Sequence, residues 1–272
     1  NIQNEKIFMI NWTRNNSTME VPFPHKTKTL EFKFSFNTSQ YSTNEEIPVV
    51  SYYPYPYTTG GGFWQMYFKK DRKKYDGQAI FRLYQSGSYS SDSGSQMPYV
   101  ELTSSVMPIF SGDIFSVMLR RNYSSSFFST GSILEDSVPI KYDLHVQRNE
   151  SGRQIFRSTS SFYVSGSYNK AFSDISKPLK NFLAIGNWPV WRNGTSIGNN
   201  FDGTLDKIRL WRVPIDDGDF EDHVNDVNSY SWASSSAAAP LYNNLYFISD
   251  VHYPIDLSNA EYITGSMSGS LG

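Results

Sequence analysis

The chain has 272 residues, a formal net charge of −2 at pH 7 and no cysteine. Its acidic and basic residues are interspersed, so it lacks the basic stripe that nucleic-acid binding requires. No apolar run approaches the roughly 20 residues that a membrane-spanning helix needs. Hydrophobic residues make up only 39% of the sequence but aromatic residues 16%, which predicts a core built largely from Phe, Tyr and Trp.

The absence of cysteine also bears on the source of the protein. Small secreted animal modules are usually held together by disulfides. We therefore expect a bacterial or viral source, or a domain large enough to be stable without disulfides. The sequence starts at Asn1 without a signal-like segment, which we interpret as a processed product or a piece of a longer chain.

Short strands separated by turns dominate the first 160 residues. Phe8, Ile10 and Trp12 alternate with less apolar neighbours, which predicts a first strand. The clearest period-2 run is 30–36, where Leu and Phe alternate with polar residues, and we expect it to be a central strand with one buried face. Further strands are expected at 19–21, 63–68, 79–84, 99–102, 114–120, 141–148, 154–158 and 162–164.

Residues 51–62 (SYYPYPYTTGGG) are expected to form a long exposed loop, because proline removes backbone donors and the glycine run is permissive. Tyrosine and tryptophan are enriched where proteins contact partners. We therefore predict that ligand or partner contacts come from the aromatic side chains of this region. Alternatively, these side chains cap the open end of a sandwich. The residues are Tyr52, Tyr53, Tyr55, Tyr57 and Trp64.

The segment 141–148 predicts a strand with its apolar residues on the inner face and Asp143, His145 and Gln147 on the outer face. The four histidines of the chain have no zinc-ligand spacing and no cysteine to accompany them. We expect them to lie at the surface.

The sharpest signal in the sequence is Phe201–Trp211 (FDGTLDKIRLW), which predicts a glycine turn followed by a strand with one wet and one buried face. An acidic cluster at 216–219 follows and is suited to a helix N-terminus. Phe220, Val224 and Val227 then recur with helical spacing, which predicts a short helix at about 219–229. A second short helix is expected at about 168–176.

This order of elements resembles the closing strand of concanavalin A-like jelly rolls of the laminin-G and pentraxin type. The residues 183–187 (LAIGN) are similar to the strand that precedes it in that family, and 19–22 and 30–36 resemble its entry strands. The resemblance implies an all-β fold, a sandwich of two antiparallel sheets with one or two short helices. It covers about 8–230, and we assign 1–233 to the sandwich. Residues 234–272 are expected to be a linker followed by a C-terminal arm or the start of a second module.

Laminin-G-like units often hold one calcium ion at a rim, so the resemblance implies Ca²⁺ as a cofactor. Asn199, Asn200 and Asp202 lie next to the closing strand and carry the oxygen ligands that calcium prefers. The alternative is that these residues only form Asx-turns.

The same fold hosts glycan hydrolases, but the chain lacks their characteristic run of alternating carboxylates. Glu101 is isolated, and Glu135 and Asp136 are adjacent, so on a strand they would point to opposite faces. We therefore expect a protein that is not an enzyme, with a glycosidase that uses an unrecognised site as an alternative.

The composition, rich in Tyr, Asn and Ser and low in charge, is similar to that of tail and decoration proteins of bacterial viruses. We expect a binding or assembly module of a larger extracellular or virion structure, whose partner is a glycan or a neighbouring protein subunit. The alternative is a purely structural subunit without a glycan ligand.

Overall fold

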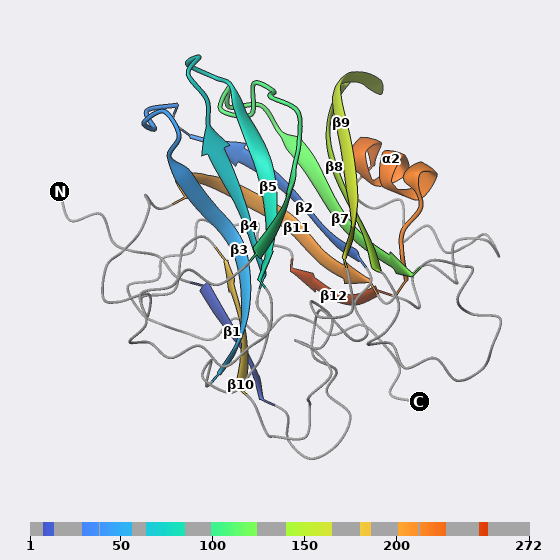
Figure 1. The fold of residues 1–272 in the computed structure, drawn as a ribbon. Coiled ribbons are helices and arrows are strands. Elements are labelled where there is room, and N and C mark those ends of the chain that lie inside the picture. The colour runs from blue at the N-terminus through green and yellow to red at the C-terminus, as the bar shows by residue number, and fades with distance from the viewer. Residues whose placement is uncertain are drawn as a thin grey trace.

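The computed structural model describes residues 8–13, 29–37, 39–55, 64–84, 99–123, 140–164, 180–185, 201–211, 213–226 and 245–249. Within these ranges the chain forms twelve strands and one helix (Figure 1). In chain order they are β1 (Phe8–Thr13), β2 (Thr29–Phe36), β3 (Glu46–Tyr55), β4 (Trp64–Lys70), β5 (Gly77–Tyr84), β6 (Tyr99–Thr103), β7 (Phe115–Tyr123), β8 (Ile140–Glu150), β9 (Arg153–Val164), β10 (Lys180–Ile185), β11 (Gly203–Trp211), α2 (Asp217–Asn225) and β12 (Leu245–Ser249).

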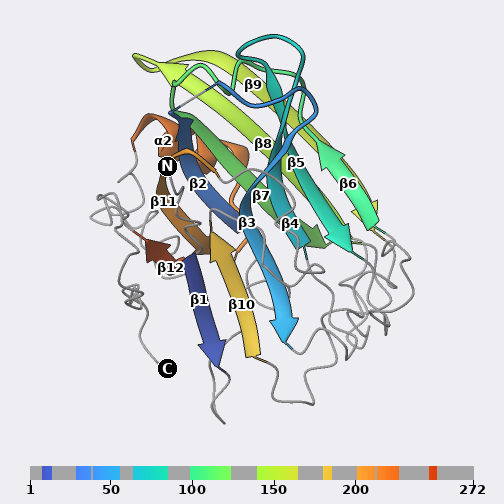
Figure 2. The ribbon, with the colours of Figure 1, turned by 90° about the vertical axis from the view of Figure 1, so that its left-hand side faces the viewer.

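The strands form two six-stranded antiparallel sheets, which confirms the predicted all-β sandwich. Sheet A has the order β1-β10-β3-β4-β5-β6, which Figure 2 shows across the molecule. Sheet B has the order β12-β11-β2-β7-β8-β9. No helix in the described part of the chain is both long and apolar enough to cross a membrane.

The core between the sheets is aromatic, as the composition predicts. β2 lies between β11 and β7, so the prediction that this run is a central strand is confirmed. Its inward residues Phe32, Phe34 and Phe36 are buried, and the Phe34 ring lies 4.2 Å from the ring of Phe68 on sheet A. Offset and tilted aromatic pairs of this kind add to the stabilisation that comes from burial alone.

A β-bulge in β11 explains the uneven spacing of its apolar residues. Leu205 and Ile208 are three positions apart, yet both contact the core. The pairing with β2 shifts between Asp206 and Arg209, and Lys207 adopts a φ of 52° there. The extra residue restores the inward direction of the side chains that follow.

Gly203, at the start of β11, allows two strands to approach closely. A Cβ atom at this position would collide with the backbone carbonyl of Ser35 on β2 and would lie 2.8 Å from the ring of Phe201. The glycine in the FDGT turn is therefore required by packing rather than by backbone conformation.

α2 lies on the outer face of sheet B (Figure 1), where its buried Phe220 and His223 face the sheet. Asp216 is the N-cap and its carboxylate accepts a hydrogen bond of 2.7 Å from the Asp219 amide. The helix begins two residues earlier than predicted because the cap is Asp216. Val227 and the second predicted helix, at 168–176, lie outside the described residues.

A buried carboxylate holds α2 against the sheet. Glu31 of β2 accepts a hydrogen bond of 2.7 Å from Nε1 of Trp211, and Nδ1 of His223 lies 3.0 Å from both of its oxygens. The rings of Trp211 and His223 stack at 5.3 Å. Nη1 of the buried Arg209 lies 3.7 Å from Glu31.

The C-terminal strand β12 pairs with β11 and forms the edge of sheet B. The boundary predicted after residue 233 lies outside the described residues, so the division of the chain at this point stays a prediction.

Candidate functional site

The outer face of sheet A carries a compact group of polar and aromatic side chains from four neighbouring strands. Alternation along β4 places Trp64, Met66 and Phe68 in the core and Tyr67 on the opposite face. The sheet register places Arg82 of β5 directly across from Glu101 of β6. The group, which we call the Arg82 cluster, consists of Glu46, Tyr67, Arg82, Tyr99 and Glu101.

Arg82 joins the two carboxylates of the cluster. Its Nε donates to Oε1 of Glu101 at 2.6 Å, and its Nη2 lies 2.5 Å from the same oxygen. Nη2 also donates to Oε1 of Glu46 at 3.1 Å. These are charge-assisted contacts, which are shorter and stronger than hydrogen bonds between neutral groups.

Two tyrosine rings enclose the same guanidinium. The Cζ atom of Arg82 lies 4.6 Å from the ring centroids of both Tyr67 and Tyr99. The Tyr67 hydroxyl donates to Glu101 at 2.5 Å and accepts from Nη2 of Arg82 at 2.5 Å. Stacking and hydrogen bonding together fix the orientation of every member of the cluster.

Burial is the main cause that raises the pKa of Tyr67 far above its usual value, and the hydrogen bond to Glu101 raises it further. The Arg82 guanidinium opposes this rise. The Tyr67 phenol therefore stays protonated near neutral pH. It can hold Glu101 in place, but it is not suited to act as a general base.

The accessible part of the cluster is acidic and aromatic. Arg82 is 8% exposed and Tyr67 is buried, whereas Tyr99 is 41% exposed. The side chains of Glu46 and Glu101 are 35% and 30% exposed. An incoming molecule thus meets one tyrosine ring and two carboxylates whose positions are set by a buried arginine.

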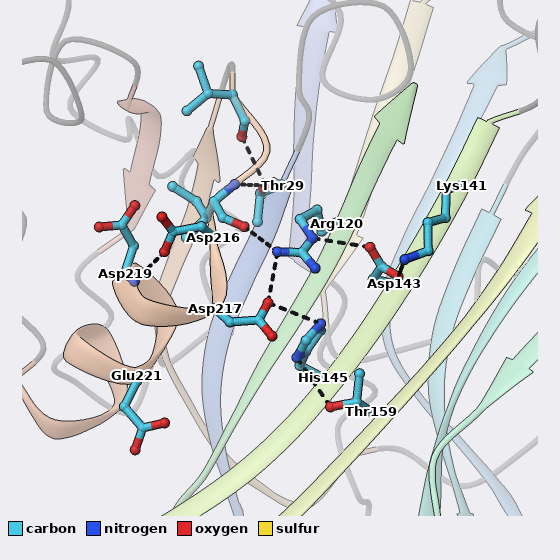
Figure 3. A network of polar contacts seen from close by, with 12 residues as sticks. Thr29, Arg120, Lys141, Asp143, His145, Thr159, Asp216, Asp217, Asp219 and Glu221 are labelled. Carbon is cyan, nitrogen blue, oxygen red and sulfur yellow. Dashed lines mark hydrogen bonds and ion pairs between the residues drawn. The ribbon is translucent and has the colours of Figure 1, made fainter. Parts of the chain in front are cut away.

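A second polar network lies between α2 and the outer face of sheet B (Figure 3). Arg120 donates to Asp143 at 3.2 Å, to the carbonyl of Ile215 at 2.8 Å and to Asp217 of α2 at 2.9 Å. Arg157 of β9 donates to the other oxygen of Asp217 at 3.2 Å. These contacts join three strands to the first turn of the helix, so we interpret the network as an anchor.

His145 lies within this network. Its Nδ1 lies 3.4 Å from the hydroxyl of Thr159, and its Nε2 lies 3.9 Å from Asp217. A hydroxyl, an imidazole and a carboxylate in sequence resemble an activated nucleophile. Because His145 is only 1% exposed and both oxygens of Asp217 are bound by arginines, the arrangement fits anchoring rather than catalysis.

We expect the stability of the protein to decrease between about pH 6.5 and pH 4. Burial lowers the pKa of His145 to about 4 from its ordinary 6.5; Asp217 opposes this and Arg120 adds to it. In this pH range the unfolded chain therefore binds a proton that the folded chain does not. The contribution of His145 to the free energy of unfolding is complete above pH 6.5 and is lost as the pH falls. The expected loss from pH 8 to pH 5 is about 2 kcal/mol.

Urea unfolding at pH 8, 7, 6 and 5 measures this dependence, with a His145→Gln variant as the control. Every other titratable group is present in both proteins. The difference between the two slopes of unfolding free energy against pH therefore isolates the contribution of His145. Equal slopes would show that His145 does not cause the pH dependence.

The predicted aromatic contact residues do not lie on one exposed loop. Residues 51–55 belong to β3 and pair with β10, so the loop prediction is wrong for them. Trp64 is 1% exposed and packs in the core, away from any ligand at the surface. Tyr52, Tyr53 and Tyr55 have backbone positions on β3, and Tyr57 lies outside the described residues. The role of these four tyrosines stays a prediction.

Pro54, the first of the two prolines in 51–62, has a structural explanation. Pairing of β3 with β4 extends only to Tyr52, opposite Trp64. Pro54 lies beyond that point and pairs with Asn181 of β10. A missing backbone donor is tolerated where a strand has a partner on one side only.

Of the predicted calcium ligands, the structure describes Asp202 only. Its Oδ1 accepts from Nδ2 of Asn37 at 3.1 Å, and its backbone amide donates to the hydroxyl of Tyr41 at 2.9 Å. Asn199 and Asn200 lie outside the described ranges. Among the described residues no group of three or more His, Asp or Glu side chains is placed to hold a metal. The calcium site stays a prediction.

The expectation that the histidines lie at the surface is wrong for the two that the structure describes. His145 and His223 are both buried because α2 covers the outer face of sheet B. Sequence reasoning also missed the Arg82 cluster. The alternation in 79–84 places Arg82 on the face opposite Phe81, but nothing in the sequence indicates that Glu101 lies beside it. Glu135 and Asp136 lie outside the described residues.

No protein-family model matches the sequence, and no curated protein shows significant sequence similarity to it. Among solved structures, the CBM40 of the Ruminococcus gnavus IT-sialidase bound to α2,3-sialyllactose is similar with 11% identity and a TM-score of 0.39. The similarity covers 72% of this chain and 81% of that chain. The same module bound to α2,6-sialyllactose has 12% identity and a TM-score of 0.38, over 72% and 82% of the two chains.

An alginate lyase from Klebsiella pneumoniae is similar over 66% of this chain and 56% of its own, with 14% identity and a TM-score of 0.34.

Proposed function

We propose that this protein is a non-enzymatic carbohydrate-binding module with a concanavalin A-like sandwich, acting in a larger extracellular or virion assembly. The Arg82 cluster is the observation that carries the proposal. Its exposed Tyr99 ring offers a face on which the apolar C–H face of a sugar ring can stack. Glu46 and Glu101, which contact the guanidinium on which Tyr99 stacks, offer acceptors for sugar hydroxyl groups.

The cluster also has the rigidity that binding requires. Arg82, Tyr67 and the two carboxylates are locked by charge-assisted hydrogen bonds, so little conformational freedom remains to be lost when a ligand binds. The cluster is built on strands rather than on loops, which keeps the positions of its groups fixed.

A glycan array probed with the full chain tests the proposal, once with calcium and once with a chelator. A specific signal is expected, and Tyr99→Ala should weaken it about tenfold or more. The matched control is Tyr163→Ala, which removes a tyrosine that is 65% exposed on sheet B. Equal losses in the two variants would place the site elsewhere.

The remaining outcomes separate the alternatives. Loss of signal in the chelator would favour the calcium site at Asn199, Asn200 and Asp202. No signal in either condition would overturn carbohydrate binding and favour a purely structural subunit whose partners are neighbouring protein chains.

A second candidate function is glycoside hydrolysis, favoured by the convergence of Glu46 and Glu101. Nη2 of Arg82 lies 3.1 Å from Oε1 of Glu46 and 2.5 Å from Oε1 of Glu101. Because both oxygens contact the same nitrogen, the distance between them cannot exceed the sum of these two distances. Retaining glycosidases place two carboxyl groups about 5–5.5 Å apart. Release of reducing sugar by the wild type, abolished in Glu101→Gln, would establish this function, and no release from any polysaccharide would exclude it.

A further inference from the structure

The charges of the Arg82 cluster bear on which sugars the module accepts, an inference that rests on the proposed carbohydrate binding. Among the described residues, the exposed charged groups that contact Arg82, on which Tyr99 stacks, are the carboxylates of Glu46 and Glu101. A carboxylate accepts hydrogen bonds and donates none. A sugar that carries a carboxylate of its own would place like charges side by side, which disfavours binding.

The arginine of the cluster is not placed to offset this repulsion. A guanidinium has five N–H donors, and contacts with Glu46, Tyr67 and Glu101 involve all three nitrogens of Arg82. The side chain lies under the tyrosine rings and is 8% exposed. An acidic sugar would have to displace a protein carboxylate in order to pair with it.

Among the described residues of this face, Lys69 of β4 lies at the end of the strand away from Tyr99. Lys69 pairs with Glu46 of β3. At the other end of β4, Trp64 pairs with Leu83 of β5, which in turn pairs with Val100, the neighbour of Tyr99. Lys69 is five residues beyond Trp64, which is about 17 Å along the strand. The backbone of Lys69 is therefore well separated from that of Tyr99, and the charges that contact Arg82 are those of Glu46 and Glu101.

We infer that the Arg82 cluster selects uncharged glycans and rejects acidic ones such as uronates and sialic acids. The sugar ring stacks on Tyr99, and adjacent hydroxyl groups donate to Glu101 and Glu46. Arg82 acts as a positioning residue, because it holds both carboxylates in place and does not contact the sugar itself.

Affinity electrophoresis with matched pairs of polymers tests this inference, because each pair shares a backbone and differs in charge. The pairs are methyl-esterified pectin with polygalacturonate, hydroxyethylcellulose with carboxymethylcellulose, and mannan with polymannuronate. The uncharged member of at least one pair should slow the migration of the full chain through the gel. The affinity for its acidic partner should be lower by about tenfold or more.

Two charge variants then locate the selectivity. Glu101→Gln should reduce the difference in affinity between the uncharged and the acidic polymer of a pair. The substitution removes one repelling charge and weakens the contact that keeps Arg82 in place. Glu150→Gln removes the same charge from an exposed position on sheet B and should leave this difference in affinity unchanged.

Each other outcome has a defined meaning. Equal or tighter binding of the acidic member overturns the inference but leaves carbohydrate binding intact. The same selectivity in Glu101→Gln as in the wild type removes this cluster as its source. Failure to bind any polymer, together with a silent glycan array, overturns the proposed function itself.

Discussion

Replacing Phe34 by alanine is expected to lower the free energy of unfolding by about 3–5 kcal/mol. The Phe34 ring is at the centre of the sandwich and lies between the two sheets. It is 4.2 Å from the ring of Phe68 and 5.8 Å from the rings of Phe36 and Phe115. Truncation removes a fully buried ring and leaves a cavity that rigid neighbouring strands cannot close.

Urea unfolding followed by far-UV circular dichroism measures this effect. Ile155→Ala is the matched control, because Ile155 is a large apolar residue on the exposed side of β9. It should change stability by less than about 0.5 kcal/mol. A similar, small loss in both variants would mean that the two sheets do not pack as described.

Replacing Glu31 by glutamine is expected to cost about 3–5 kcal/mol, although the side chains have the same shape. Glu31 is buried between sheet B and α2, where it accepts a hydrogen bond from Trp211 and contacts His223 and Arg209. The neutral amide leaves Arg209 buried without the negative charge that the structure places 3.7 Å away. Removing one partner of a buried ion pair is more harmful than removing both.

The fluorescence of the tryptophans, which include Trp211 in contact with Glu31, reports this change during urea unfolding. Asp222→Asn is the control, because it removes a carboxylate from the exposed side of the same helix. If the glutamine variant is as stable as this control, Glu31 is not the residue that fixes α2 to the sheet.

The sequence predicts best where a pattern is local and one face of an element is buried. The alternation in β2 and the turn, strand and helix that end at α2 depend on neighbours a few residues apart. The bulge at Lys207 could not be predicted in the same way, because it is required by the pairing of β11 with a strand about 170 residues earlier. Gly203 is a further example, since its neighbour Ser35 is distant in sequence.

The candidate site was harder to predict for the same reason. Its members come from β3, β4, β5 and β6, and only the sheet register brings Glu46, Tyr67 and Glu101 around Arg82. Composition pointed instead to the tyrosines of 51–57, because prolines usually mark loops. Likewise, polar residues on the outer face of β8 indicated solvent exposure, although α2 and its anchor cover His145.

The pairing of distant strands has a consequence for how the chain folds. Glu31 and His223, whose contact holds α2, are 192 residues apart in the chain. Closing so long a loop costs entropy before any contact compensates for it, and domains dominated by such pairings fold slowly. During synthesis β2 is made long before β11, the strand that completes one of its edges. Until then one edge of β2 is unpaired and Phe36 lacks its ring contact with Phe201, so early chains are expected to need protection from aggregation.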